Sequence, residues 1–362
     1  MIFLNLDREY EFFNWKKILE PIFEKKDFIN GKCVSDFEEK VKEYIGAQYA
    51  LGVSSGTDAL WVSLLSLGIK NPTVLTTPYS FISTVEVPIR YGSKIVFCDI
   101  DKTFNIDIDK CKEIILNNHI DIFIPVHLFG LPCNLDNEIL NICKKRGTYI
   151  IEDAAQSFGS KLKNKYVGTI GDIGCFSFFP SKNLGCAGDG GMVVTNSKEI
   201  YEKAKMIKNH GSCEKYNHIT HGGNYRLDTI QAAILNAKLS DINYFIRSRI
   251  DTASAYNYAF KKIEEINIPK CKVGTHTYNQ YVLQIKEDRD GLKEYLKKKD
   301  IPTALYYPYC LAEQPCYEGI DFGDNCPNSK KMTKQNLALP IAHLRKDEVD
   351  FIIKSINNFY GK

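Results

Sequence analysis

The feature that most constrains this chain of 362 residues is a regular alternation of strand and helix patterns in its first half. Short apolar runs rich in β-branched residues alternate with longer segments in which apolar residues recur at helical spacing. Such alternation is typical of an α/β fold, in which helices cover both faces of a mostly parallel sheet. The predicted strands are residues 74–77, 95–100, 122–126 and 149–152, and the helices between them are residues 81–90, 108–116 and 135–145.

The second half of the chain continues this core and adds a smaller domain. The patterns that follow are a strand over 173–179, a strand over 190–196, a helix over 197–208 and a polar loop over 209–226. A single long helix over 227–263 is predicted to lead into C-terminal strands and helices. We therefore predict a large domain over 1–249 and a smaller C-terminal α/β domain over 250–362.

Two helix starts lie upstream of the alternation. Ser35 and Glu38 have the spacing of a capping box, which predicts a helix over 35–45. Further along, a serine- and glycine-rich turn around Gly56 precedes a helix predicted over 58–67. Glycine lets a ligand approach the backbone, and a helix N-terminus presents unpaired N–H groups to an anion. Such a turn is more often only a cap, so by itself it does not predict a phosphate site.

The composition excludes several classes of protein. Charged residues make up 25% and hydrophobic residues 44% of the chain, and the net charge is +3. Such a balance is typical of a soluble globular protein and does not indicate a nucleic-acid or membrane partner. No apolar run approaches the roughly 20 residues of a membrane helix, and the N-terminus lacks the apolar core of a signal peptide. We therefore expect a cytoplasmic protein.

The number and spacing of the cysteines also indicate the cytoplasm. The chain has 12 cysteines, scattered and without a CxxC pair. A zinc site needs closely spaced ligand pairs, and disulfide frameworks are typical of small secreted domains. We predict free thiols in a reducing compartment and no metal site.

Lys182 is the strongest candidate for a chemical role. It follows an apolar run that ends at Pro180, and several glycines stand nearby. A lysine held at the rim of a core is partly desolvated, which lowers its pKa and frees an amine nucleophile. An isolated lysine in a glycine-rich turn is more often an ordinary surface residue. Lys182 is not isolated, because two other polar motifs precede it.

Asp153 belongs to one of these motifs, and the turn around Gly56 is the other. Asp153 directly follows a predicted buried strand, so it is either a capping residue or a partner for a buried cation. A protonated pyridine nitrogen is such a cation. Ligands of α/β sheets gather at the carboxyl ends of the strands, where Phe81, Asp153 and Lys182 would all lie. A phosphate cradle, a carboxylate and a poised lysine are together the parts that hold pyridoxal 5′-phosphate.

Four segments carry a resemblance to a known family. Residues 54–60, 152–156, 178–184 and 222–228 resemble the signatures of the DegT/DnrJ/EryC1/StrS family, in the expected order and over nearly the whole chain. The resemblance implies the aspartate aminotransferase-like fold (fold type I). It also implies a pyridoxal phosphate-dependent aminotransferase that moves an amino group from L-glutamate to a keto sugar linked to a nucleotide.

The resemblance also assigns roles to individual residues. Lys182 would carry the cofactor covalently and shuttle a proton, Asp153 would pair with the ring nitrogen, and Gln156 would lie beside the ring hydroxyl. Phe81 would stack on the ring. The predicted phosphate ligands are Gly56, Thr57, Asp58, Ser177 and, from the neighbouring subunit of a homodimer, Asn224. The predicted substrate contacts are Arg226, Tyr306 and Tyr307.

One departure and two alternatives accompany this resemblance. Where many relatives have His-Tyr-Pro, this chain has Tyr306-Tyr307-Pro308, which alters the hydrogen-bonding groups near the sugar. The segment around Lys182 is more similar to relatives that aminate C3 of the sugar than to those that aminate C4. The resemblance further implies a sugar linked to UDP or dTDP and an amino-sugar product for surface glycans. The alternatives are a sugar dehydratase, which would have histidine in place of Lys182, and a regulatory or sensor protein without enzymatic activity.

Overall fold

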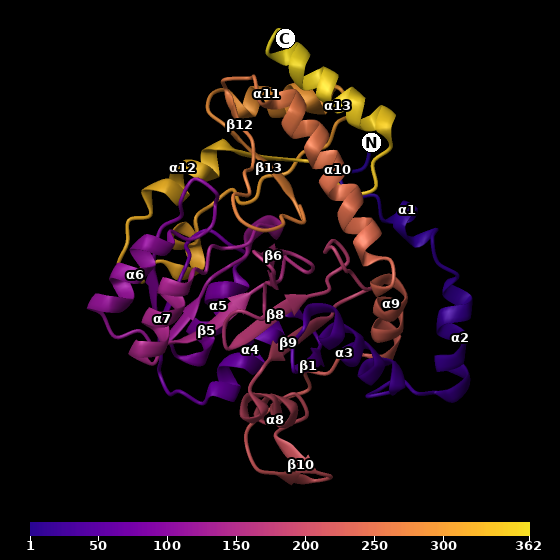
Figure 1. Ribbon diagram of the computed structural model, residues 1–362, viewed down its shortest axis with the longest axis vertical. Helices are drawn as coiled ribbons and strands as arrows, with labels where there is room; N and C mark the ends of the chain where they lie inside the picture. Colours follow the sequence, from indigo (N-terminus) through magenta and orange to yellow (C-terminus); the bar gives the residue numbers. More distant parts are fainter.

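The large sheet has seven strands in the spatial order β1-β9-β8-β5-β4-β2-β3. The computed structural model describes all residues from 1 to 362 (Figure 1). The strands are β1 (Tyr49–Val53), β2 (Thr73–Thr76), β3 (Lys94–Phe97), β4 (Ile122–Ile124), β5 (Tyr149–Asp153), β8 (Ile173–Ser177) and β9 (Gly191–Thr195). Neighbours from β3 across to β8 pair in parallel, and only β9 runs antiparallel, to both β8 and β1. The predicted mostly parallel sheet is confirmed.

Helices cover both faces of this sheet because its strands are apolar on both sides. Val74 and Ile122 pack in one core cluster with α4, α5 and α8, whereas their neighbours Leu75 and Phe123 pack on the opposite face with α6 and α7. Near the β1 edge, α3 and α9 complete that second layer. The covering helices are α3 (Lys32–Ile45), α4 (Gly56–Leu67), α5 (Ser83–Tyr91), α6 (Ile108–Asn117), α7 (Asn137–Arg146), α8 (Lys198–Ile207) and α9 (Thr229–Leu239).

A second, antiparallel sheet of three strands, in the order β12-β13-β14, lies in the C-terminal part of the chain. Its core cluster draws only on residues between Ala253 and Ile356. Figure 1 shows α10 running from beside the large sheet up to this smaller unit. The elements are α10 (Ile242–Phe260), β12 (Ile266–Asn267), β13 (Tyr281–Ile285), α11 (Arg289–Lys298), α12 (Pro327–Gln335), β14 (Asn336–Leu339) and α13 (Lys346–Phe359).

The prediction of one helix over 227–263 is wrong, because the chain breaks between α9 and α10. Ser240 and Asp241 stand at the break, and the Ser240 hydroxyl donates to the Ala237 carbonyl. Serine and aspartate compete with helical hydrogen bonds through their own side chains, which is why they occur at helix ends. The predicted polar loop over 209–226 likewise contains a short hairpin of β10 (Ser212–Glu214) and β11 (Asn217–His218), which projects from the body of the molecule (Figure 1).

The capping box predicted at Ser35 and Glu38 is also wrong. Helix α3 begins at Lys32, so Ser35 lies inside it and its hydroxyl donates to the Lys32 carbonyl. The Lys32 N–H instead donates to the Asp27 carboxylate, 3.2 Å away. Glu38 accepts the N–H of Gly52 at 2.7 Å and therefore ties α3 to β1.

The N-terminal and minor elements lie at the periphery. The first two helices are α1 (Leu6–Tyr10) and α2 (Trp15–Lys25), and a small hairpin is formed by β6 (Lys161–Leu162) and β7 (Lys165–Tyr166). Arg8 in α1 pairs with Glu348 in α13, so the two ends of the chain lie side by side. No helix of the structure combines the length and the apolar character needed to cross a bilayer.

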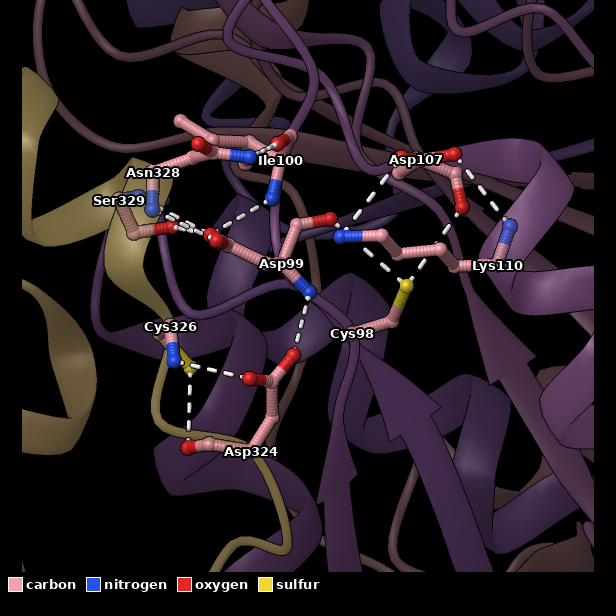
Figure 2. A network of polar contacts seen from close by, with 9 residues as sticks. All are labelled: Cys98, Asp99, Ile100, Asp107, Lys110, Asp324, Cys326, Asn328 and Ser329. Carbon is pink, nitrogen blue, oxygen red and sulfur yellow. Dashed lines mark hydrogen bonds and ion pairs between the residues drawn. The ribbon is translucent and has the colours of Figure 1, made fainter.

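Asp99, just beyond β3, attaches helix α12 to the large sheet (Figure 2). Its carboxylate is fully buried and accepts the N–H groups of Asn328 at 2.7 Å and Ser329 at 2.9 Å, in the first turn of α12. At the other end of α12, the Asn336 side chain accepts the Tyr306 N–H at 2.8 Å and donates to the Tyr307 carbonyl at 3.0 Å. Helix α12 therefore links the backbone of Tyr306 and Tyr307 at one of its ends to Asp99, just beyond β3, at the other.

Candidate active site

A cavity of ≈ 570 Å³ lies at the carboxyl ends of the parallel strands, beneath the segment that carries Tyr306 and Tyr307. Parallel sheets collect their ligands at this edge. Most of the residues predicted from the sequence line the cavity: Gly56, Thr57, Phe81, Asp153, Gln156, Ser177, Lys182, Tyr306 and Tyr307. The structure therefore brings together motifs that are far apart in the sequence.

Lys182 lies on the wall of this cavity without a carboxylate in salt-bridge contact. The backbone N–H of Lys182 donates to the Phe179 carbonyl at 2.9 Å, and this hydrogen bond closes a tight turn just beyond β8. Burial lowers the pKa of the Lys182 amine to about 8, and the attraction of the Asp153 carboxylate opposes this shift. About a tenth of the amine is therefore neutral, and so nucleophilic, at pH 7.

Asp153 is a buried carboxylate without an ion-pair partner in the chain. It ends β5, and only 5% of its surface is exposed. The Thr84 hydroxyl donates to it at 2.8 Å, and the Ala155 N–H donates at 3.2 Å. Burial raises the pKa of Asp153, whereas these two hydrogen bonds and the charge of Lys182 lower it. A cation in the cavity would stabilise the ionised carboxylate.

Both ends of the Gln156 side-chain amide form hydrogen bonds. Its side-chain oxygen accepts the Phe129 N–H at 2.8 Å, and its side-chain nitrogen donates to the Tyr307 hydroxyl at 2.9 Å. Both ends of the amide are therefore fixed, one by the loop after β4 and the other by the C-terminal segment. Burial raises the pKa of Tyr307, so its hydroxyl keeps its proton and can itself donate.

The N-terminus of α4 forms a cradle for an anion. Ser55 caps the helix by accepting the Asp58 N–H at 3.0 Å, while the N–H groups of Gly56 and Thr57 find no acceptor within the chain. A Cβ added at Gly56 would lie 2.7 Å from the Cβ of Ser177, so only glycine allows α4 to start this close to the end of β8. Free N–H groups at a helix N-terminus are a general binding site for phosphate.

Three predicted residues lie outside the cavity. Asp58 accepts the Ser54 hydroxyl at 2.5 Å and thus supports the turn. Asn224 and Arg226 belong to an extended segment beside β1, at the outer edge of the large sheet. The Arg226 guanidinium donates to the Asn209 side chain at 3.0 Å, but its buried Nε has no acceptor in the chain.

Two residues near the site, His127 and Cys186, make contacts that support the fold and do not indicate a chemical role. His127 is fully buried, and one ring nitrogen bonds Glu152 at 2.8 Å while the other accepts the Cys133 N–H. His127 is therefore part of a buried hydrogen-bond network with Glu152 and the Cys133 backbone, and it does not line the cavity. Cys186 contacts the carbonyls of Phe178 and Gly188, and burial raises the pKa of its thiol to about 12, so it is not a reactive thiolate.

Sequence reasoning missed several residues of the cavity. Thr84 is the direct partner of Asp153, and only its position one helical turn after Phe81 could have indicated it. Asn279 and Gln280 come from the turn before β13, and the side-chain oxygen of Asn279 is buried without a donor. No motif surrounds these two residues, because they reach the cavity only through the docking of the small domain.

Comparison with known proteins places the chain in a family. Residues 14–357 match the model of the DegT/DnrJ/EryC1/StrS aminotransferase family. The chain belongs to this family. The family resemblance is thereby confirmed over nearly the whole chain.

Individual relatives include enzymes and one protein with a regulatory name. A "pleiotropic regulatory protein" of Geobacillus stearothermophilus is 35% identical over 99% of this chain and 98% of its own length. A UDP-N-acetyl-3-dehydro-alpha-D-glucosamine 3-aminotransferase of Acidithiobacillus ferrooxidans is 35% identical over 91% of this chain and 89% of its own. A UDP-2-acetamido-2-deoxy-3-oxo-D-glucuronate aminotransferase of Pseudomonas aeruginosa is 34% identical over 94% of both chains.

Solved structures agree in fold. An aminotransferase of this family from Brucella abortus superimposes with a TM-score of 0.94, at 33% identity and over 100% of both chains. DesV of S. venezuelae, determined in complex with a ketimine intermediate, also has a TM-score of 0.94, at 28% identity over 100% of this chain and 98% of that one. The predicted fold type I and the transaminase chemistry are confirmed.

The cofactor of this aminotransferase is pyridoxal 5′-phosphate. The residues present fit it at three points. Asp153 is a buried carboxylate that lacks a cation, Lys182 is an amine of lowered pKa, and the start of α4 has free N–H groups for a phosphate. The exposed ring of Phe81 borders the same cavity, where it can stack on a flat heterocycle.

The lowered pKa of Lys182 predicts how capture of the cofactor depends on pH. With a pKa of about 8, the neutral fraction of the amine rises as pH rises. The rate of covalent capture by cofactor-free protein should therefore increase about tenfold between pH 7 and pH 9 and then level off. Stopped-flow absorbance after mixing with pyridoxal phosphate would measure it. A rate that keeps rising beyond pH 10 would show a lysine of ordinary pKa and contradict this assignment.

Proposed function

We propose that this enzyme transfers the amino group of L-glutamate to a keto sugar carried on a nucleotide, at C3 of the sugar, to make an amino sugar for surface glycans. The observation that carries the proposal is the arrangement of Lys182 and Asp153 around one cavity. The names of two relatives support a UDP-linked sugar with a keto group at C3. A lysine at position 182 speaks against a dehydratase of this family.

Each residue of the cavity has a task in this reaction. The bound cofactor supplies an electron sink for the electrons left on the donor carbon when its proton is removed. Lys182 would take that proton as a neutral amine and return it to the adjoining carbon of the cofactor, since its lowered pKa lets it exist in both forms. Asp153 would keep the ring nitrogen protonated, and Thr84 orients the carboxylate.

The sugar end of the cavity is formed by two tyrosines. Tyr306 and Tyr307 are partly buried, and Asn336 and the Tyr79 hydroxyl hold their backbone at 2.8–3.0 Å. Their phenols offer hydrogen bonds to sugar hydroxyls at the place where many relatives have a histidine before the tyrosine. Since a phenol keeps its proton at neutral pH while an imidazole titrates, binding of the sugar here would not depend on pH near 6 to 7.

A panel of substrates tests the proposal. Purified enzyme with L-glutamate should aminate a UDP-linked 3-keto sugar with a kcat/KM at least about tenfold above that for 4-keto sugars and for dTDP-linked 3-keto sugars. Product formation would be followed by mass spectrometry. Preference for a 4-keto sugar would contradict the C3 assignment. Absence of any reaction with glutamate, together with no turnover of any keto sugar, would favour a regulatory protein without enzymatic activity.

We further propose that each active site is shared between two subunits of a homodimer. Asn224 and Arg226 lie away from the cavity of their own chain, and the buried Nε of Arg226 has no acceptor there. In the proposed two-fold dimer this edge of each subunit would meet the cavity of the other, because a two-fold interface uses the same surface of both subunits. Asn224 of the partner subunit would then bind the cofactor phosphate, and Arg226 would contact the sugar substrate.

Complementation between two inactive variants tests the shared site. Lys182→Ala would be mixed with a variant that carries Asn224→Ala and Arg226→Ala. Each mixed dimer would contain one site with both defects and one site with neither. About a quarter of the wild-type activity should therefore return after complete random exchange of subunits in an equal mixture. Exchange confirmed by mass spectrometry without return of activity would refute the shared site, provided that the double variant alone is inactive.

A further inference from the structure

A second cavity, of ≈ 240 Å³, lies between the large sheet and the smaller sheet. Its walls come from the loop after β3, the loop after β4 and the segment around β12 and β13. It does not contain Lys182 or any part of the phosphate cradle, and Gln280 is the one residue that borders both cavities. The reaction described above leaves this cavity without a role.

The charge around this cavity is of one sign. Lys102, Lys270 and Lys272 line it, and no aspartate or glutamate does. All three lysines are exposed, and none forms an ion pair within the chain. The carboxylate nearest to Lys102 in sequence, that of Asp101, does not line the cavity and accepts the N–H of Thr103 at 2.7 Å. Three like charges around one cavity, with no carboxylate in its lining, raise the local concentration of anions.

The interior of the cavity suits a flat ring. Phe104 and Phe129 are buried and meet edge to face, with ring centroids 5.6 Å apart, and Leu131 and Val282 add apolar surface. The side chain of Gln280 is 8% exposed and makes no hydrogen bond within the chain, so its amide is free to pair with a ligand. Apolar walls with a few polar groups are typical of small-molecule sites.

The remaining titratable group is neutral and adds no charge. Burial lowers the pKa of His276 to about 3, and its Nδ1 accepts the Tyr278 N–H at 3.0 Å. The positive charge of the site therefore comes from the three lysines alone. Lysine ammonium groups at a rim and aromatic rings within are the two halves of a site for a phosphorylated ligand that carries a ring.

We propose that this cavity binds a nucleoside phosphate as a second ligand, separate from the substrate of the catalytic cavity. The lysines would hold the phosphates, and the base would lie against Phe104 and Phe129 beside the Gln280 amide. This site is independent of which sugar the enzyme aminates. Because Phe129 also donates its N–H to Gln156, the ligand would touch a residue that positions the catalytic cavity.

Binding of UDP to the cofactor-loaded enzyme tests this site. In equilibrium dialysis, the variant with Lys102→Ala, Lys270→Ala and Lys272→Ala should bind one UDP fewer per chain than the wild type, because affinity at this cavity should fall at least about tenfold. A control variant with Lys298→Ala, Lys334→Ala and Lys354→Ala removes three exposed lysines that line neither cavity, and it should bind as the wild type does. Activity of the first variant should stay within about twofold of wild type.

The outcomes separate the possible ligands. Pyrophosphate should displace this UDP more weakly than UDP itself, and uridine should not displace it, because each lacks one half of the ligand. Equal numbers of bound UDP in the lysine variant and the wild type would refute the site. A loss of UDP together with a raised KM for the nucleotide sugar would show that the cavity holds the substrate's own nucleotide. Equal affinity for pyrophosphate and UDP would refute recognition of the base.

Discussion

Lys182→Ala should abolish turnover and remove the visible absorption of the covalently held cofactor. In the proposed role the amine would be both the attachment point and the group that moves the proton, so no neighbouring side chain could replace it. General acid–base catalysis alone contributes roughly 100- to 10,000-fold, which sets the smallest expected loss. The activity and the absorption spectrum of the purified variant would be measured together, because both depend on the same nitrogen.

Two further variants make the Lys182 result specific. Lys182→Arg keeps a positive charge but offers no amine of lowered pKa, so it should be as inactive as the alanine variant. Lys198→Ala removes an exposed lysine at the start of α8 and should leave activity unchanged. Turnover above one hundredth of wild type in Lys182→Ala, with the fold shown intact by circular dichroism, would overturn the assignment.

Asp153→Asn should still bind the cofactor but slow the half-reaction with glutamate by about 100-fold. The amide keeps the shape of the carboxylate and can still accept the hydrogen bond from Thr84. It cannot supply the negative charge that, in the proposed role of Asp153, would keep the ring nitrogen protonated, so the electron sink would be weakened. Rapid-mixing absorbance of the bound cofactor would follow this half-reaction without any sugar substrate.

A second carboxylate serves as the control for Asp153. Asp121 accepts the Thr73 N–H at 2.8 Å, at the start of β2 and β4 and therefore at the opposite edge of the sheet. Asp121→Asn makes the same chemical change away from the cavity and should leave the half-reaction rate unchanged. A normal half-reaction in Asp153→Asn would mean that Asp153 only caps the end of β5.

Local sequence patterns were sufficient to predict the large sheet. Short apolar runs and helical spacings of apolar residues report burial directly, so the strands and helices from β2 to β5 were predicted with small errors at their ends. Lys182 and Asp153 could be recognised for the same reason. Asp153 ends the buried strand β5 and Lys182 lies in the turn beyond β8, and strand ends of a parallel sheet meet at one edge.

The same local patterns failed where neighbouring side chains compete for hydrogen bonds. The break at Ser240 lies within an otherwise helical apolar pattern, and the start of α3 is decided by Asp27, outside the predicted capping box. Apolar periodicity contains no information about which polar side chain bonds which N–H group. Helix ends and breaks were therefore the least accurate part of the prediction.

The sequence by itself determined the α/β sheet and the family, and it predicted the residues of the cofactor end of the cavity, Lys182 and Asp153 among them. Only the tertiary structure placed Thr84 on Asp153, Asn336 on the backbone of Tyr306, and three unpaired lysines around a second cavity. These contacts join residues that are far apart in sequence. No local pattern encodes them, because they depend on how the smaller unit packs against the ends of the strands.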